Sequence, residues 1–354
     1  MSEPDILISA PELTTYIQQV LEAVQVPKPK AALVATSLVA SNLRGVDSHG
    51  VQLITFYVEQ IEYGDMNPHA DGHIISENGG SMVFHGEDGL GQHVAQVCSD
   101  HAIRLAKEHG ISMVVARESN HFGAAAYWAQ KMAAAGQIGI VVCDASAIVP
   151  PWQGKQNRIG TNPICMAVPG PWLLDMATTT VAANKIFKAS MNHQPTIPAG
   201  WAMDSEGIPT TDTQTALKGL IMPLGGYKGS GLAMMVEILC AVLSGGAMST
   251  ELGGIRIRGR KFRVNQSFIA IEIERFMPVA EFTARVERLV QMMKNTTPAA
   301  GYDEVLVAGE PEWRTEAARK RDGIPIGAGT WESLSSIGRR LGVAVPATTA
   351  QSGA

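Results

Sequence analysis

The chain has 354 residues, of which 45% are hydrophobic and 17% are charged, and its formal net charge is −5. A chain of this length and apolar content can bury one large core or two ordinary ones without covalent cross-links. The slight acidic excess, with no long block of like charge, gives no reason to expect nucleic acid or an anionic membrane as a partner. No run of about 18 apolar residues occurs and the first residues lack a signal-peptide pattern, so we expect a cytoplasmic protein.

Cysteine usage indicates reduced thiols. The four cysteines are far apart and form no CxxC pair: Cys98, Cys143, Cys165 and Cys240. This spacing is typical of core thiols in a reducing compartment and not of disulfides or a structural zinc site. We therefore expect no bound metal.

The first 74 residues have a helical pattern. Ser9 and Glu12 have capping-box spacing ahead of apolar residues at helical intervals, which predicts a helix beginning near residue 10. Helical stretches follow at 29–45 and 51–64, and they are separated by a short break. The N-terminal part is therefore predicted to be mainly helical.

From residue 81 the pattern changes to that of a mixed α/β layer. Short β-branched runs alternate with alanine-rich helical stretches, and the last such strand is expected near residue 270. An amphipathic helix over 281–296 is expected to return to the N-terminal helices. The predicted domains are residues 75–284, which are α/β, and residues 1–74 together with 285–354, which are mainly helical.

The first candidate catalytic residue is His49, in the segment VDSHG between two predicted helices. Histidine titrates near neutral pH, so it can donate and accept a proton within one catalytic cycle. The adjacent Ser48 can hold one ring nitrogen or join a proton relay. The alternative, that His49 only caps the next helix, stays open on the local sequence alone.

A second candidate, His121, follows an apolar strand and precedes an alanine-rich helix in the segment SNHFGAAAYW. It is therefore expected at a helix N-terminus, where free N–H groups favour anions. A purely structural histidine is the alternative.

Two further segments carry polar groups beside predicted strand ends. Asp175 follows an apolar strand and can orient a histidine, although it is also suited to capping a helix. Lys228 stands in a glycine-rich turn ahead of an apolar helix, a position suited to a phosphate or a polarised carbonyl. This turn lacks the spacing of a phosphate-binding P-loop. The segment Gly89-Leu90-Gly91 lies between a strand and a helix, but Val94 replaces the third glycine of the dinucleotide fingerprint.

Taken in order, LRGVDSHGV, DGLGQ, SNHFGAAAYW, GTNP, DMATT, PLGGYKGSGLAMMVEIL and VLVAGEPEWR resemble the type 2 malate/L-lactate dehydrogenase family, over about residues 10–340. That family includes ureidoglycolate and sulfolactate dehydrogenases, diketogulonate reductase and piperideine-2-carboxylate reductase. The resemblance implies a non-Rossmann NAD(P)-binding domain with a mixed sheet, a helical domain, and a homodimer. It also implies NAD or NADP as cofactor and a small molecule as substrate.

The same resemblance implies roles for individual residues. His49 would be the proton donor, with Ser48 and Asp175 as its relay; in some members the histidine matching His121 has the acid/base role, so the choice between the two stays open. Substrate contacts would fall on His121, Leu53, Thr161 and Asn162. Cofactor contacts would fall on Ser146, Met176, Ala177, Thr178, Lys228, Gly309 and Glu310.

Three departures from the family pattern affect these expectations. Tyr227 replaces a usual histidine and Ala308 a usual proline, both beside expected cofactor contacts. Leu53 stands where many relatives have an arginine that clamps a carboxylate, so monocarboxylic substrates are expected. Arg44 or Arg158 could supply the missing charge from another segment.

The predicted reaction is the NAD(P)H-dependent interconversion of a small 2-oxo acid or cyclic 2-imino acid with its 2-hydroxy or amino acid. The alternative is a catalytically inactive ligand-binding or scaffold protein on the same fold. Sequence does not decide between NAD and NADP. The basic run RIRGRKFR near residue 260 could meet a 2′-phosphate, but a solvated loop explains it as well.

Overall fold

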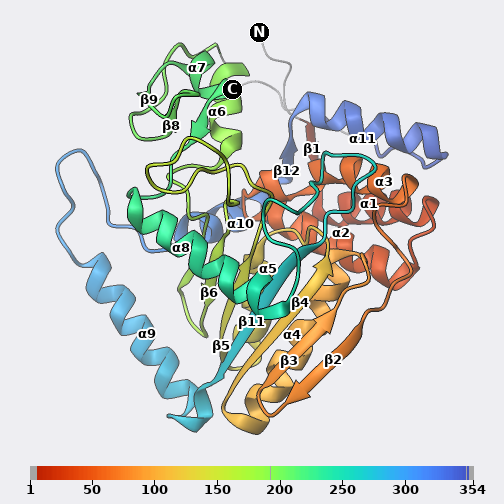
Figure 1. Cartoon of the computed structure of the whole chain (residues 1–354). Coiled ribbons are helices and arrows are strands. Elements are labelled where there is room, and N and C mark those ends of the chain that lie inside the picture. The colour runs from red at the N-terminus through yellow and green to blue at the C-terminus, as the bar shows by residue number, and fades with distance from the viewer. Residues whose placement is uncertain (1–5, 192, 348, 351–354) are drawn as a thin grey trace.

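The computed structural model describes residues 6–191, 193–347 and 349–350, and a seven-stranded sheet is its central element (Figure 1). The strand order is β2-β3-β4-β11-β5-β6-β7, with β3 and β4 parallel and every other neighbouring pair antiparallel. A Rossmann sheet is mostly parallel, so the expected non-Rossmann α/β fold is confirmed. The strands of this sheet are β2 (His73–Asn78), β3 (Ser81–His85), β4 (Ile111–Ser119), β5 (Gln137–Cys143), β6 (Ile164–Ala167), β7 (Leu173–Met176) and β11 (Val264–Glu272).

Helices cover both faces of the sheet. On one face α4 (Gly91–His109) and α5 (Ala125–Ala134) pack against a large apolar core that includes the fully buried Trp128. The Trp128 indole donates a hydrogen bond of 2.9 Å to the carbonyl of Phe122, which ties α5 to the loop before it. On the other face lie α8 (Tyr227–Glu237) and η3 (Ile238–Val242), a π-helical turn.

The GLG segment belongs to a true βαβ unit, β3-α4-β4, in which both strands are parallel. A Cβ at Gly91 would collide with the backbone carbonyls of Asn120 and His121. The glycine is thus required because α4 begins directly against the loop that follows β4. The close packing of two backbones therefore explains Gly91, and one of these backbones carries the candidate site residue His121.

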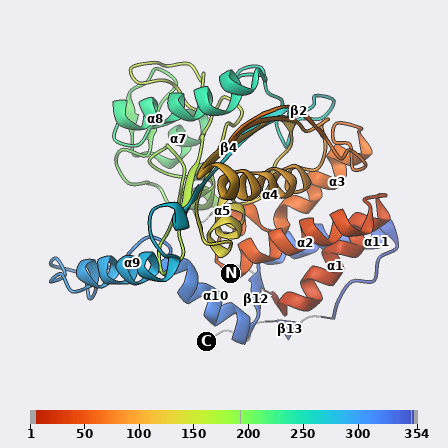
Figure 2. The same ribbon diagram turned by 90° about the horizontal axis from the view of Figure 1, so that it is seen from below.

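A helical layer formed by both ends of the described chain packs against the sheet domain (Figure 2). The capping box is confirmed, since the Ser9 side chain accepts a hydrogen bond from the N–H of Glu12. The Tyr16 hydroxyl donates to the carbonyl of Leu334 at 2.7 Å and joins the first helix to the last. The layer comprises α1 (Ala10–Ala23), α2 (Lys28–Leu43), α3 (Ile54–Glu62), α11 (Ala328–Leu341), and the small sheet of β1 (Ile6–Ile8), β12 (Ile324–Ile326) and β13 (Thr349–Ala350).

The remaining elements form a small lobe, a projecting helix and connecting turns. The lobe has its own apolar cluster. Its elements are α6 (Ala183–Met191), α7 (Thr213–Lys218), β8 (Ala202–Met203), β9 (Pro209–Thr210) and β10 (Leu220–Ile221). The others are α9 (Val279–Lys294), α10 (Glu310–Asp322), η1 (Asp47–His49), η2 (Val51–Leu53) and η4 (Ile273–Arg275). Among the described residues, no helix is long and apolar enough to cross a lipid bilayer.

Helix α9 differs from the sequence expectation. It projects from the sheet domain away from α1, α2 and α3, and Val290 is its buried residue (Figure 1). Helix α11 is the element that returns to α1 and α3, α10 reaches α2, and β12 pairs with β1. Amphipathicity identified the helix but not the surface that its apolar side would meet. The predicted division at residues 74/75 and 284/285 stays a prediction.

Candidate active site

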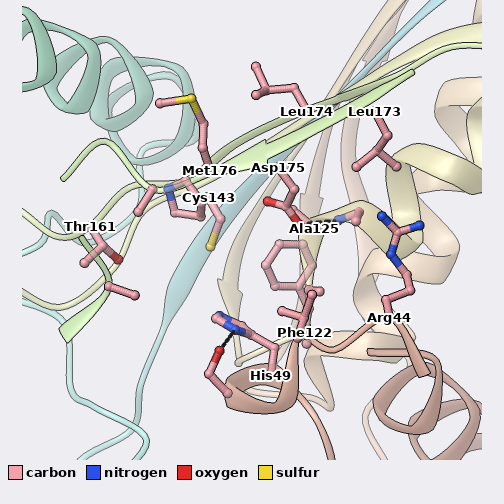
Figure 3. Close-up of a pocket in the computed structure, with 18 of the residues that line it drawn as sticks. Arg44, His49, Phe122, Ala125, Cys143, Thr161, Leu173, Leu174, Asp175 and Met176 are labelled. Atoms are coloured by element: carbon pink, nitrogen blue, oxygen red, sulfur yellow. Dashed lines mark hydrogen bonds between the residues drawn. The ribbon is translucent and has the colours of Figure 1, made fainter. Parts of the chain in front are cut away.

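A pocket of about 560 Å³ lies where the turn η1 of the helical layer meets the ends of β5 and β7 and the start of α10. Figure 3 shows His49 on η1 and Asp175 on β7 around this space. The structure thereby gathers groups that are distant in sequence. The predicted site residues that line the pocket are Ser48, His49, His121, Thr161, Asp175, Met176, Ala177 and Gly309.

The turn that carries His49 is held by side chains from two helices. Arg319 of α10 donates to both carboxylate oxygens of Asp47, at 2.7 and 3.0 Å. Asn42 of α2 donates to Asp47 at 2.6 Å and accepts from the N–H of Val51 at 2.8 Å. A three-residue 3₁₀ turn has few internal hydrogen bonds, so these external ones fix its geometry. His49 is therefore presented by a turn clamped on both sides.

The imidazole of His49 has one ring nitrogen engaged. Its Nδ1 lies 2.9 Å from the Ser48 hydroxyl, which leaves Nε2 for a ligand (Figure 3). Burial lowers the pKa of His49 below its usual 6.5, because a charged ring is poorly solvated there. The ring is thus neutral at pH 7 in the free protein and can accept a proton from a ligand.

His121 has a different hydrogen-bonding pattern, which fixes its tautomer. Its Nδ1 accepts from the backbone N–H of Gly123 at 3.2 Å, and the Tyr57 hydroxyl lies 2.8 Å from the same nitrogen. Gln92 donates to that hydroxyl at 2.9 Å. Because a backbone N–H is only a donor, Nδ1 must be unprotonated and the neutral ring carries its proton on Nε2.

The protonation of His121 is strongly opposed. Burial, and secondarily the nearby His49, lower the pKa of His121 to about 3. The two rings are stacked with centroids 5.6 Å apart, so two cations there would repel each other. His121 can consequently donate a hydrogen bond from Nε2 but is a poor proton acceptor. The pair combines one titrating imidazole with one fixed donor.

Asp175 faces the same pocket without a hydrogen bond to either histidine. Its Oδ2 accepts from the N–H of Ala126 at 3.0 Å, so it caps the N-terminus of α5 from a different element (Figure 3). Water reaches the carboxylate from the pocket, yet the protein on its other sides raises its pKa to about 6. Of the two sequence alternatives the structure shows the helix cap, and the role of Asp175 in orienting a histidine stays a prediction.

Several predicted site residues support the pocket wall from behind. Asn162 accepts from the N–H of Ala145 at 3.0 Å and donates to Glu237 at 2.9 Å. Thr178 donates through its hydroxyl to the carbonyl of Thr161 at 2.9 Å. Ser146 donates to the carbonyl of Gly253 at 2.6 Å. Their polar groups are used within the protein and do not line the pocket.

Three other predicted residues lie away from the pocket. Leu53 is 6% exposed and packs in the apolar core of the helical layer, so its side chain does not reach the pocket. Lys228 is exposed at the start of α8. Glu310 forms ion pairs with Lys294 and Arg314, both at 2.5 Å. The start of α10 still contributes through Gly309, whose φ of +89° favours glycine.

Sequence reasoning missed groups that the fold brings to the site. Tyr57 lies inside a helix and carries no local motif, so only its contact with His121 reveals it. Gln92 ends the DGLGQ motif but was given no role there, and it reaches His121 only through the Tyr57 hydroxyl. Asp144 lines the pocket, and burial raises its pKa well above the usual value. Glu312 joins it from α10. The strand-end position of Asp144 in GIVVCDAS was the one available signal.

The basic run near residue 260 makes contacts within the protein. Arg258 donates to Glu59 at 2.7 Å, and Lys261 pairs with Asp88 at 2.5 Å. Arg256 lies over the ring of Phe56, 5.2 Å from its centroid. These contacts account for several of the charges without a phosphate.

Comparison with known proteins identifies the family. Residues 8–335 match the family model described as malate/L-lactate dehydrogenase. The malate dehydrogenase of Pyrococcus horikoshii is 36% identical over 97% of this chain and 98% of its own length. The L-sulfolactate dehydrogenase of Methanocaldococcus jannaschii is 37% identical over 92% of this chain and 95% of its own.

Solved structures agree with the sequence relatives. The structure of the M. jannaschii sulfolactate dehydrogenase matches with a TM-score of 0.90 at 36% identity, covering 96% of this chain and 98% of that one. The δ1-piperideine-2-carboxylate reductase of Pseudomonas syringae matches with a TM-score of 0.83 at 25% identity, covering 94% and 99%. The predicted oxidoreductase class is confirmed, and with it the NAD or NADP chemistry of dehydrogenases. The chain belongs to the malate/L-lactate dehydrogenase family.

Proposed function

We propose that this enzyme interconverts a small 2-oxo acid and its 2-hydroxy acid with NAD or NADP, with His49 exchanging the proton and His121 orienting the substrate. The observation that carries the assignment is the unequal bonding of the two imidazoles. His121 Nδ1 accepts from the N–H of Gly123, whereas His49 Nδ1 has only the Ser48 hydroxyl, which can donate or accept. His49 is therefore free to change protonation state.

The pocket fits a nicotinamide nucleotide. Much of its wall is backbone and small side chains, including Gly123, Ala125, Ala177 and Gly309, which allow a flat ring to approach closely. At Gly123 the φ of +78° favours glycine, so this part of the wall carries no side chain. When bound, the nicotinamide ring supplies or accepts the hydride. Met176, Ala177 and Gly309 are the predicted contacts that face this space.

The chain's own residues then handle the substrate and its proton. The N–H at Nε2 of His121 donates to an oxygen of the 2-oxo acid and orients it without being titrated. His49, when protonated, gives its proton from Nε2 to the reduced oxygen and takes it back in oxidation. Ser48 holds the other ring nitrogen so that the imidazole keeps one orientation. The clamp on Asp47 keeps this turn in place while the proton moves.

The decisive test is oxidation of NADH and NADPH with pyruvate, phenylpyruvate, oxaloacetate and piperideine-2-carboxylate. Activity with at least one 2-oxo acid supports the proposal. Activity with the cyclic imine alone would favour the imine reductase interpretation, which the similarity to the P. syringae reductase makes worth testing. Nucleotide binding without turnover of any of these substrates would favour the inactive binding protein. Because Leu53 does not line the pocket, its apolar side chain gives no reason to exclude oxaloacetate.

Replacing Asp175 by asparagine should lower turnover more than nucleotide affinity. The amide still accepts from the N–H of Ala126, so the cap on α5 is kept while the charge beside the reaction is removed. Asp175→Ala should lower turnover similarly and also lower the free energy of unfolding by about 1 kcal/mol, because the cap is lost. Steady-state kinetics, nucleotide titration and chemical denaturation separate these effects. A large rise in the nucleotide Kd with unchanged turnover would make Asp175 a cofactor ligand instead.

We propose that the enzyme is a homodimer, and an exposed apolar face supports this. On α8 and the helical turns after it, five large apolar side chains are between 41% and 57% exposed: Met234, Met235, Ile238, Val242 and Leu243. Homodimer interfaces are more apolar than ordinary protein surface, and a second copy of this chain is the partner that the family resemblance implies.

Ile238→Lys should therefore convert the dimer to a monomer, since a lysine would have to be buried without a partner. Leu289→Lys on α9, where Leu289 is 52% exposed, is the matched control and should leave the dimer intact. Light scattering after size exclusion measures the mass. A dimer that survives Ile238→Lys and dissociates with Leu289→Lys would place the interface on α9.

A further inference from the structure

Arg44 is a buried cation at the pocket, and two of its guanidinium nitrogens have no hydrogen-bond partner among the described residues. The residue is 7% exposed and lines the pocket from the C-terminal end of α2 (Figure 3). Among the residues that the structure describes, its Nε and Nη1 atoms have no hydrogen-bond partner. The other arginine near the catalytic turn, Arg319, is bound to both oxygens of Asp47.

An unpaired buried guanidinium is unusual for a physical reason. Arginine stays protonated in proteins, so it cannot avoid the cost of burial by losing its charge. Buried charges are normally paired because desolvation is costly and only a close partner offsets it. An arginine without a partner at the wall of a cavity is therefore expected to bind an anion that enters the cavity.

The surroundings of Arg44 favour an oxyanion at this place. Ala125 and Ala126, at the N-terminus of the ten-residue helix α5, line the same pocket, and a helix N-terminus favours negative charge. Asp175 and Glu312 are the acidic groups that line it on this side. Asp175 accepts its hydrogen bond from the N–H of Ala126 and not from Arg44. Neither acid satisfies the two orphaned nitrogens.

We propose that Arg44 is the anion-binding residue of this pocket and takes an oxyanion of a bound ligand through two parallel hydrogen bonds. The chemistry is that of a carboxylate or sulfonate of the substrate, or of a phosphate of the cofactor; a planar guanidinium suits each of these. The inference rests on the proposed function, since both candidate ligands come from it. Arg44 would then supply the positive charge that many relatives have as an arginine at the position of Leu53.

The variant Arg44→Met tests this with little risk to the fold. Methionine replaces the buried stem with apolar atoms and removes an unpaired charge, a change that is often neutral or stabilising. Arg44→Lys keeps the charge but loses the two-pronged geometry. Arg117→Met is the matched control: Arg117 has a buried, unpartnered Nε and lies outside the pocket. Thermal unfolding of all three variants checks that they are folded.

Two binding titrations distinguish the sources of the oxyanion. The first follows NADH and NADPH binding to the free enzyme, and the second follows oxalate binding to the free enzyme and to its complex with reduced nucleotide. We expect Arg44→Met to weaken the affinity for one of these two ligands by about 10- to 100-fold, which is the usual effect of losing a charge-assisted hydrogen bond. The affinity of Arg44→Lys should be intermediate, and that of Arg117→Met should equal the wild-type value. Weaker binding of the nucleotide indicates that Arg44 binds a phosphate of the cofactor. Weaker binding of oxalate alone indicates that Arg44 binds the acid group of the substrate.

Unchanged affinities for both ligands in Arg44→Met would overturn the proposal, and so would a wild-type enzyme that binds neither. A wild type that binds oxalate but no reduced nucleotide would contradict the proposed function. The oxalate titration of the Arg44 variants would still decide the role of Arg44 in that case.

Discussion

Replacing His49 by alanine should lower kcat for 2-oxo acid reduction by about 10²–10⁴-fold, the usual cost of losing a general acid. The reason is that His49 is the pocket imidazole whose Nδ1 is not committed to accepting a hydrogen bond, whereas burial and the nearby His49 keep His121 neutral. The fold and the nucleotide Kd should change little, because the turn is fixed by Asp47 and not by the imidazole. Stopped-flow reduction with saturating nucleotide measures the effect on the chemical step.

His121→Gln is the control for this result. A glutamine amide can still donate a hydrogen bond to the substrate, so KM should rise while kcat falls much less than in His49→Ala. Tyr57→Phe removes the hydroxyl beside Nδ1 and should act in the same direction as His121→Gln, with a smaller effect. If His49→Ala keeps near-native turnover and His121→Gln abolishes it, the two roles must be exchanged.

The second large effect is on pH dependence. Reduction needs the protonated His49 and oxidation needs the neutral one, and burial lowers the pKa of His49 below 6.5. The value of kcat/KM for reduction should therefore fall about tenfold for each pH unit above that pKa. For oxidation of the 2-hydroxy acid, kcat/KM should rise up to the same pKa and stay level above about pH 6.5.

Ser48→Ala offers a check on this assignment. Losing the hydroxyl at Nδ1 should shift the titration of His49, whereas His121→Gln should leave a titration in the same pH range. If the reduction profile has no titration below pH 7, or if it disappears in His121→Gln, another group supplies the proton.

Much of the fold follows from local signals. The capping box at Ser9 and Glu12 predicted the first helix, and the βαβ pattern around Gly91 is present in the sheet. Gly91 also shows the limit of a motif, because its backbone approaches another backbone and not a pyrophosphate. The family motifs predict the non-Rossmann class without any knowledge of strand order.

Strand order could not be read from the sequence. The central strand β11 lies between β4 and β5 but follows them by more than a hundred residues. This strand includes Asn265 and Gln266, which are polar but fully buried, so the apolar pattern of the sequence does not indicate how deeply the strand is buried. Gln266 is accommodated because it donates to the carbonyl of Asn120 at 2.8 Å. Such partners exist only once the sheet is assembled.

The site residues that have reactive side chains within a sequence motif were predictable. Residues that reach the site only through long-range contacts were not. His49, His121 and Asp175 were named from their segments and meet in one pocket. Arg319 clamps the turn that carries His49 through Asp47, 272 residues away, and no local pattern reveals it. Leu53 was expected to face the substrate by family position, but the 3₁₀ turn η2 directs its side chain into the helical core.

The assignment of His49 and His121 is tested most directly by a ¹⁵N NMR titration of the imidazoles in the free enzyme, with the signals assigned through His49→Gln and His121→Gln. We expect His121 to stay neutral, with its proton on Nε2, from pH 8 down to about pH 4, because its pKa is about 3. His49 should gain its proton below pH 6.5. A His121 ring that protonates near neutral pH, or that carries its proton on Nδ1, would contradict the assignment of His49 as the group that exchanges the proton.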